Sequence, residues 1–315
     1  MSTKTEATTA AVELADSPLV SSVANINNCN SQHIIATTKA STDIVIRPRP
    51  GWIAIDWQEM WAYRELFYYL VKRDVSVRYK QTVLGPAWAV IQPLLTMIIF
   101  TVIFGRGLEI PSEGFPYPIF VFAGLLPWTF FSQGLSASAL SLVNQQQLLT
   151  KVYFPRLFVP VASACVFLID MAISAGIYAV LFLFYFITQG ITPSWLTLPV
   201  LVYLVPMTMV ATLGMGLTLA ALTVFYRDFK HLVPFLVQIL MYVSPVFYPA
   251  RLVKDWWPIL ALNPMFGIID GYRYAILGLP CNPGALAISS ATAVGMFLFS
   301  LFYFRKTERQ FADFA

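Results

Sequence analysis

The chain has 315 residues, of which 58% are hydrophobic and only 11% are charged. Soluble domains carry about 25% charged residues, so this composition excludes an ordinary soluble protein and favours one that crosses a membrane several times. The formal net charge of +4 is small and scattered, which argues against a nucleic-acid partner. The cysteines, Cys29, Cys165 and Cys281, lie far apart and only His33 and His231 accompany them, so we expect neither a structural disulfide nor a metal site.

Residues 1–46 differ in composition from the rest of the chain, because Ser, Thr, Ala and Asn dominate them. They lack the basic start and apolar core of a cleaved signal peptide. Low hydrophobicity of this kind predicts a disordered cytoplasmic tail. We therefore divide the chain into this tail, an amphipathic interfacial region at 47–80 and a membrane domain at 81–315.

Residues 57–74 have the periodicity of an amphipathic helix. Its apolar side holds Met60, Tyr63, Leu66, Phe67, Leu70 and Val71. Trp52, Trp57 and Trp61 flank this helix, and such aromatic residues are enriched at the depth of the lipid headgroups. The pattern favours a helix that lies in the membrane interface, with a helix packed on a soluble partner as the alternative.

The segment that begins at Arg78 leads from a basic stretch into an apolar one. Arg78 and Lys80 prefer water or lipid phosphate, and Gly85 and Pro86 predict a bend. The following run, 87–104, contains no charged residue. At about 1.5 Å per residue it covers most of a bilayer core of about 30 Å, so it is predicted to be the first membrane span.

We expect six membrane spans, at about 87–104, 119–140, 158–187, 196–225, 232–249 and 285–304. If the N-terminus is inside, most loop Lys and Arg residues fall on the inner side, and the outer side holds only Arg106, Arg251, Lys254 and Arg273. Positive residues are enriched in cytoplasmic loops, so both termini are expected in the cytoplasm.

Two inner loops carry distinct patterns. The loop at 144–156 changes from polar to apolar, and its Leu148, Leu149, Val152 and Tyr153 would form a docking surface if they are exposed. A plain connector is the alternative, although it would not need this apolar cluster. The short charged loop at 226–231 is consistent with a topological anchor.

The outer loop at 250–284 contains a helix that is too short and too polar to span. Asn263 is a good N-cap and Pro264 suits the first turn. The helix then carries Asp270 and Arg273 at i,i+3 spacing. We expect short re-entrant or interfacial helices here, and such elements on the outer side often gate a pathway.

The sequence lacks the motifs of an enzyme. No Gly-x-x-x-x-Gly-Lys-Ser/Thr loop is present, so the chain has no ATP site of this kind. Asp170 is the one ionisable residue clearly inside a span, which makes it a functional candidate, and a hydrogen bond between helices is the alternative. Gly214 and Gly216 predict close helix packing in the fourth span.

Aromatic residues recur in several spans. They either face lipid or line a lumen, where their rings would stack on the C–H faces of sugars. The strongest candidates in the first and fifth spans are Trp88, Phe100, Phe104, Tyr242, Phe247 and Tyr248.

The order and spacing of several motifs match one family. They are Arg78-Tyr-Lys-Gln-Thr-Val-Leu-Gly-Pro-Ala-Trp-Ala-Val-Ile-Gln-Pro, Lys151-Val-Tyr-Phe-Pro-Arg156, Tyr226-Arg-Asp-Phe, and Leu262-Asn-Pro-Met with Tyr272-Arg. From about residue 52 onward the chain resembles the transmembrane subunit of type-2 ABC transporters that export polysaccharides such as O-antigen, capsule and teichoic acid. The resemblance does not include 1–46.

This resemblance implies a six-span permease subunit that forms a homodimer in the bacterial inner membrane, with two copies of an ABC ATPase subunit beneath it. ATP and Mg would be bound by the ATPase, with no cofactor and no catalytic residue in this chain. The substrate would be a polysaccharide on an undecaprenyl diphosphate carrier, and membrane lipid would surround the chain.

The resemblance also implies roles for particular residues. The residues of the ATPase-coupling helix would be Gln147, Leu148, Leu149, Lys151, Val152, Tyr153 and Phe154. Those that meet the lipid diphosphate would be Arg73, Arg78 and Lys80, with positive-inside anchoring as the alternative. Those of the outer gate would be Trp256, Trp257, Asp270, Tyr272 and Arg273.

Three other functions remain open from the sequence. An exporter of small drugs or lipids would share the architecture but have a narrower, less aromatic lumen. An ion-coupled flippase would depend on Asp170 rather than on an ATPase. A membrane glycosyltransferase would carry exposed acids for metal or base roles, and the sequence shows no convincing cluster of them.

Overall fold

A computed structural model describes residues 57–80, 87–147, 154–192, 194–253 and 255–308. Within these ranges the chain is helical and contains no strand, as predicted. All of the described helices belong to one unit, Trp52–Ala315. The predicted tail at 1–46 lies outside the described residues.

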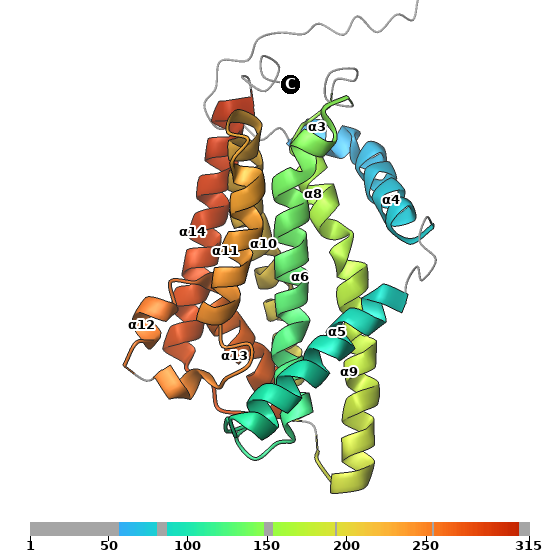
Figure 1. The fold of residues 1–315 in the computed structure, drawn as a ribbon. Helices are drawn as coiled ribbons and strands as arrows, with labels where there is room; N and C mark the ends of the chain where they lie inside the picture. Colours follow the sequence, from blue (N-terminus) through green and yellow to red (C-terminus); the bar gives the residue numbers. More distant parts are fainter. Residues whose placement is uncertain (1–56, 81–86, 148–153, 193, 254, 309–315) are drawn as a thin grey trace, which may run out of the picture. The chain divides into compact units, whose positions relative to one another are not determined.

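Five helical segments of the described chain are long and apolar enough to cross a bilayer (Figure 1). Some of them combine an α-helix with a shorter helical piece. Their parts are α5 (Ala87–Phe100) with the π-helix η1 (Thr101–Gly107), α6 (Tyr117–Asn144), α8 (Phe158–Cys165) with α9 (Phe167–Gln189), the 3-10 helix η2 (Leu198–Val200) with α10 (Leu201–Phe225), and α14 (Pro283–Glu308). These segments coincide with five of the six predicted spans.

The remaining predicted span, 232–249, corresponds to the shorter helix α11 (Phe229–Val243), which has 15 residues. At about 1.5 Å per residue, a helix of this length falls short of a bilayer core of about 30 Å. The helix ends early because Pro245 disfavours a helical conformation at the residue before it, and Ser244 is extended with ψ at 142°. The described residues therefore contain five full-length candidate spans and, at the predicted fifth span, one shorter apolar helix.

Helix α6 forms the centre of the bundle (Figure 1). It packs against α8, α9, α10 and α13 (Pro264–Leu277), and α10 packs in turn along α14. Most of its side chains between Ile119 and Leu142 are buried, with Phe120, Phe122 and Phe131 among the largest. A helix that is apolar on all sides needs neighbours on all sides, which explains its central position.

Glycines allow α10 to approach two neighbours closely. A Cβ at Gly214 would lie 2.9 Å from the backbone nitrogen of Phe297 in α14. A Cβ at Gly216 would lie 2.7 Å from Ser138 Oγ in α6. The prediction that these small residues serve close helix packing is confirmed.

The predicted amphipathic helix is present but longer than expected. It consists of α3 (Trp57–Ala62) and α4 (Arg64–Lys80), and so continues beyond the predicted end at 74. Its predicted apolar side packs against the membrane bundle, with Leu70 buried and the ring centroids of Phe67 and Phe158 5.4 Å apart. The large side chains exposed on α4 are mainly Tyr68 and Tyr69. The apolar stripe is therefore used for contacts within the chain.

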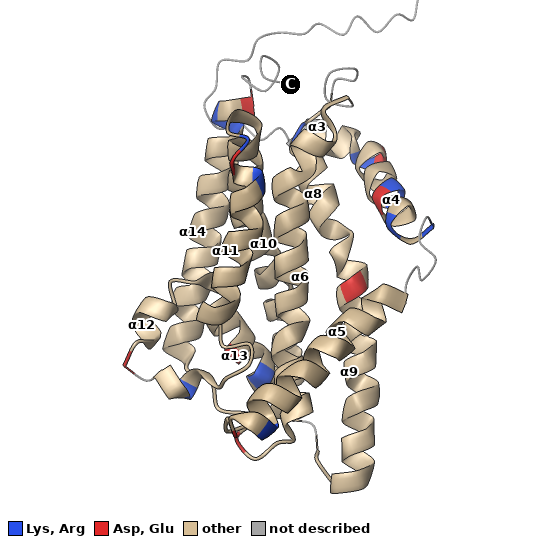
Figure 2. Cartoon of the chain, in the orientation of Figure 1, with Lys and Arg blue, Asp and Glu red and all other residues tan. Residues whose placement is uncertain are grey.

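The two ends of the bundle differ in their charged residues. At the basic end, which we define by 154–157, 226–230 and 305–308, the guanidinium of Arg156 donates to the carbonyl oxygen of Glu308 at 2.7 Å. At the opposite end, defined by 108–116, 190–192, 194–197, 250–253, 255–256 and 278–282, Arg251 pairs with Glu113 at 3.6 Å. Figure 2 shows Lys and Arg gathered mainly on α4 and at the basic end.

Candidate functional site

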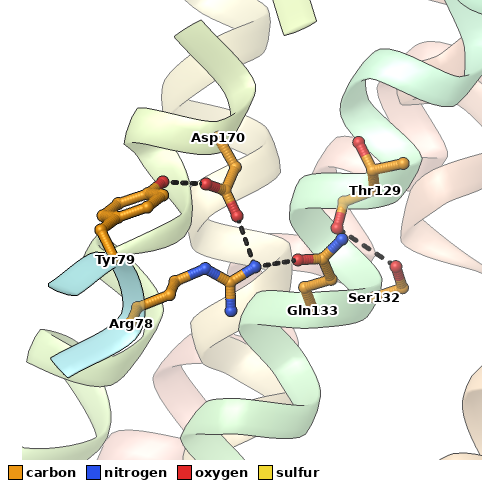
Figure 3. Close-up of polar contacts among 6 residues, drawn as sticks. All are labelled: Arg78, Tyr79, Thr129, Ser132, Gln133 and Asp170. Atoms are coloured by element: carbon orange, nitrogen blue, oxygen red, sulfur yellow. Dashed lines mark hydrogen bonds and ion pairs between the residues drawn. The ribbon is translucent and has the colours of Figure 1, made fainter. Parts of the chain in front are cut away.

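Asp170 in α9, the acid predicted inside the third span, is ion-paired (Figure 3). Its Oδ2 accepts a hydrogen bond from Arg78 Nη2 at 2.7 Å, and its Oδ1 accepts one from the Tyr79 hydroxyl. The same nitrogen of Arg78 donates to Gln133 Oε1 at 3.0 Å. These four residues, here called the Asp170 cluster, join α4, α6 and α9.

The surroundings of the Asp170 cluster stabilise its charges. The side chain of Asp170 is 12% exposed and that of Arg78 is 36% exposed, so the carboxylate depends on its partners more than the guanidinium does. The Arg78 guanidinium also lies 4.5 Å from the centre of the Phe167 ring, in a cation–π contact. Burial and the hydrogen bond to Asp170 raise the pKa of Tyr79 to about 12, so its hydroxyl stays protonated and donates.

The space beside the Asp170 cluster is small. Arg78, Gln133 and Asp170 line a cavity of ≈ 10 Å³, together with Pro93 of α5. This volume is about the minimum that one water molecule needs. The cluster is therefore a joint between helices, and it has no room for a ligand in this conformation.

The other two predicted diphosphate contacts lie in different surroundings. Arg73 donates to its neighbour Asp74 at 2.9 and 2.7 Å, and the second oxygen of Asp74 accepts from Gln145 at the end of α6 at 3.4 Å. Lys80 is exposed at the last position of α4. Two of the three predicted cations thus already have a carboxylate partner within the chain.

Five of the six predicted lumen aromatics form one cluster. Phe247 is its centre, with ring centroids 4.6 Å from Phe104, 5.8 Å from Phe100, 6.3 Å from Tyr242 and 5.2 Å from Tyr248. The cluster, here called the aromatic cluster, joins η1 and the end of α5 to the end of α11. Its side chains are partly exposed, and Tyr242 is the most exposed of them at 60%.

The sixth aromatic, Trp88, is separate from this cluster. It lies in the first turn of α5 and is 52% exposed. Twelve positions separate it from Phe100, or about 18 Å at 1.5 Å per residue. Aromatic residues thus lie at both ends of α5, about 18 Å apart along the helix.

The predicted helix after Asn263 is α13, and its start is as expected. The Asn263 side chain accepts a hydrogen bond from the backbone nitrogen of Met265 at 3.1 Å, and Pro264 occupies the first turn. The helix ends at Gly278, whose φ of 71° favours glycine. α13 packs against α6, α10 and α14, so it is part of the core of the bundle.

Arg273 on α13 is almost fully buried and binds backbone carbonyls. Its guanidinium donates to Val246 at 2.7 Å, to Tyr248 at 3.0 Å and to Phe120 at 3.4 Å, and it lies 3.9 Å from the centre of the Phe120 ring. Gly124 leaves the space for it, because a Cβ there would lie 2.9 Å from Arg273 Nη2. Arg273 thereby holds the segment after α11 against α6.

The remaining gate candidates are divided between core and surface. Tyr272 is buried, and its hydroxyl lies 3.3 Å from Thr208 Oγ1 in α10. Trp256 and Trp257 begin the short helix α12 (Trp257–Leu260), with Trp256 65% exposed. Asp270 accepts a hydrogen bond from the backbone nitrogen of Asn282 at 3.3 Å and forms no ion pair with Arg273 in the described chain.

The predicted ATPase-coupling residues are described only in part. Leu148, Leu149, Lys151, Val152 and Tyr153 lie outside the described residues. Gln147 is exposed after the end of α6, whereas Phe154 is 5% exposed and packs in the core of this chain. The two described residues that flank the coupling segment therefore face different surroundings.

Several residues of these sites were not predicted from the sequence. Tyr79 and Gln133 complete the Asp170 cluster, and Tyr117 donates its hydroxyl to the carbonyl oxygen of Phe247 at 2.7 Å. Gln133 carried a usable signal, because an amide in an otherwise apolar span needs a partner. Phe120 and Tyr117 resemble the many other aromatic residues of the spans, so the sequence gives no signal that distinguishes them.

The chain belongs to the family of ABC-2 type transporters, whose membrane domain matches residues 65–277. The match begins in α4 and ends at the last residue of α13. It therefore includes the Asp170 cluster, the aromatic cluster and the buried Arg273.

Curated relatives include permeases of polysaccharide export. The chain is 32% identical over 260 residues to the O-antigen export system permease protein RfbA of Myxococcus xanthus, covering 80% of this chain and 96% of the relative. It is 25% identical over 256 residues to RfbA of Klebsiella pneumoniae, covering 79% and 94%. It is 23% identical over 215 residues to the polysialic acid transport protein KpsM of Escherichia coli, covering 66% and 80%.

Proposed function

We propose that this chain is the permease subunit of an ATP-driven exporter that moves a polysaccharide, linked to undecaprenyl diphosphate, across the bacterial inner membrane. The observation that carries the proposal is the likeness to an O-antigen export permease over 96% of that relative's length. Two copies of the chain would form the channel, and two copies of an ATPase subunit would drive it.

The aromatic cluster supports a carbohydrate as the substrate. Partly exposed rings of Phe100, Phe104 and Phe247 stand together where the ends of α5 and α11 meet. Stacked rings bind the C–H faces of sugars while the hydroxyl groups stay hydrated. A channel between two copies, lined mainly by α5 and α11, would place these rings along the path.

The ends of the coupling segment support a link to an ATPase. Phe154 is held in the core and Arg156 is bonded to Glu308, so the segment after 153 is anchored to the bundle. Before it, Gln145 at the end of α6 contacts Asp74 of α4. Force applied by the ATPase at 147–154 would therefore reach α4, α6 and α8 together.

The distribution of charge supports an orientation. Lys and Arg gather at the basic end and on α4, which corresponds to the cytoplasmic side of membrane proteins. Both termini would then be cytoplasmic, and α12 and α13 would lie on the outer side as gate helices. Lys80, exposed at the end of α4, is the best placed of the three cations to meet the lipid diphosphate.

The ion-coupled alternative receives less support. It requires Asp170 to take up and release an ion, but both carboxylate oxygens of Asp170 already accept hydrogen bonds, from Arg78 and from Tyr79. An Asp170→Asn variant that keeps its fold should therefore retain export that depends on the ATPase.

The experiment that tests the proposed function is purification of the full chain in mild detergent together with whatever binds it. A stoichiometric ATPase is expected, and it should be lost when Leu148, Leu149 and Tyr153 are changed to Ser. The control is Leu196→Ser at the opposite end, where a 92% exposed side chain should leave the ATPase bound. Deletion of the gene should also remove the surface polysaccharide and trap its lipid-linked form inside the cell. A chain that purifies without an ATPase, and whose loss leaves the surface polysaccharide intact, contradicts the proposal.

A further inference from the structure

A groove at the opposite end of the bundle is lined by two of the predicted gate residues, Trp257 and Asp270. It has a volume of ≈ 340 Å³ and lies between Arg251 on η3 (Ala250–Val253), Trp257 on α12 and Asp270 on α13. Cys281 and Asn282, in the turn before α14, complete the wall. The volume lies near the lower limit of the ~300–1,000 Å³ that small-molecule sites occupy.

Asp270 is the residue in this wall that most needs an explanation. It is a carboxylate on a helix that is otherwise mainly apolar, and only one of its oxygens accepts a hydrogen bond from the described residues, from the backbone of Asn282. Arg273, one turn later, gives its donors to backbone carbonyls instead. A largely buried carboxylate is costly without partners. The second oxygen of Asp270 accepts no hydrogen bond from the described residues, so it can accept one from a ligand in the groove.

The other walls are held in place by the chain. Gly284 makes room for the Trp257 ring, because a Cβ there would lie 3.2 Å from Trp257 Cη2. Arg251 is placed by Glu113 at 3.6 Å and by the carbonyl oxygen of Pro280 at 3.4 Å. The groove thus presents an aromatic ring, an acceptor and a donor from three different elements, α12, α13 and η3.

We propose that this groove is a saccharide-binding site, which holds a short segment of the exported polysaccharide on the outer side of the membrane domain. The inference rests on the proposed function and adds a contact outside the channel. The C–H face of a sugar ring would stack on Trp257, its hydroxyl groups would donate to Asp270 and accept from Arg251, and the volume admits about one or two rings.

Cys281 provides a direct measurement of occupancy, because it lines the groove. Burial and the nearby Asp270 carboxylate raise the pKa of the Cys281 thiol, so it should be labelled at mildly alkaline pH. The complex of full chain and ATPase, with Cys29→Ser and Cys165→Ser, is labelled with N-ethylmaleimide. The probe is the set of short oligosaccharides released by mild acid from the cell's own surface polysaccharide.

The oligosaccharides should slow the labelling of Cys281 in a saturable way. Asp270→Asn and Trp257→Leu should each raise the concentration for half-maximal protection about tenfold, as expected for one lost hydrogen bond to a charged group or one lost stacking contact. Matched controls are Asp255→Asn and Trp195→Leu, two exposed residues that do not line the groove. Both controls should keep the protection of the parent.

Export in cells separates failure of this inference from failure of the proposed function. If deletion of the gene abolishes the surface polysaccharide and the oligosaccharides protect Cys281, both the proposed function and this inference are supported. If deletion abolishes it but the oligosaccharides give no protection, the groove is not a saccharide site and the transport function remains. If deletion leaves the surface polysaccharide unchanged, the transport function is wrong and the inference falls with it.

Discussion

Arg78 and Arg273 show how much the role of one residue depends on parts of the chain that are distant in sequence. Arg78 pairs with an acid 92 positions away, whereas Arg273 passes over Asp270 on its own helix and binds carbonyls that include Phe120, 153 positions away. The i,i+3 spacing indicated Asp270 as a neighbour of Arg273, whereas the basic side chain of Arg78 and the family resemblance indicated a lipid phosphate as its partner. Neither partner in the structure is visible from local spacing, because it depends on which helices lie side by side.

The Asp170 cluster leads to a stability prediction. Asp170→Asn keeps the shape of the side chain but leaves Arg78 without its counter-charge in a partly buried place. Loss of a hydrogen bond to a charged group costs about 1.5–3 kcal/mol, so the thermal unfolding midpoint in detergent should fall. Release of the end of α4 should also increase proteolysis near Lys80.

A double-mutant cycle distinguishes this pairing from a general effect of mutation. Arg78→Gln combined with Asp170→Asn should cost clearly less than the sum of the two single changes, because each single change leaves a charge without its partner. Asp255→Asn, at an exposed position before α12, is the control and should leave the midpoint unchanged. Simple additivity of the two changes would show that the pair contributes nothing to stability.

At the scale of the element, hydrophobicity predicted the spans better than it predicted their ends. Prolines lie inside α5, α6, α10 and α11, at Pro93, Pro127, Pro206 and Pro234, without ending these helices. Pro245 does end α11, which shortened the predicted fifth span. Neighbouring helices stabilise a proline-containing helix in the membrane, so the effect of each proline depends on packing that the sequence does not display.

Helix α4 shows a second limit of the same kind. Periodicity correctly grouped the apolar side chains around Leu70 on one face. It could not tell whether that face meets lipid, a partner or the same chain, because all three are apolar surfaces. The structure shows contacts with Phe158 and the bundle beside it.

The close approach of α10 and α14 leads to a prediction about glycine. Gly214→Val should strongly destabilise the protein, because even a Cβ would lie 2.9 Å from the Phe297 backbone nitrogen, and a backbone cannot move aside as a side chain can. Overpacking of a core typically costs about 1–3 kcal/mol. Yield of folded protein and the thermal midpoint would measure the effect.

The control for this prediction is a glycine on the partner helix. Gly295→Ala on α14 meets nothing within 4 Å, so it should be neutral or stabilising by about 0.5–1 kcal/mol, the usual difference between the two residues in a helix. Equal losses at Gly214 and Gly295 would mean that sensitivity does not follow the contact between α10 and α14.

At the scale of the whole molecule, the candidate sites depend on convergence of distant elements. Residues such as Phe104 and Phe247 were predicted as members of a large set of aromatics, and the structure stacks their rings at 4.6 Å. Trp88 belonged to the same set and lies apart. The sequence could identify side chains with suitable chemistry. The selection among them follows from the packing of Phe247, in the segment after α11, against η1 and the end of α5, which no local pattern encodes.

The asymmetry of charge between the two ends leads to the last prediction, which concerns orientation. Positive residues are retained on the cytoplasmic side, so the basic end should face the cytoplasm. In a chain with its three cysteines changed to Ser, Leu196→Cys should react with a membrane-impermeant maleimide in intact spheroplasts, because this position is 92% exposed at the opposite end. Lys230→Cys, exposed at the basic end, should react only after the membrane is permeabilised. The reverse pattern would mean that the protein has the opposite orientation in the membrane. The saccharide groove would then face the cytoplasm, and α12 and α13 could not be outer gate helices.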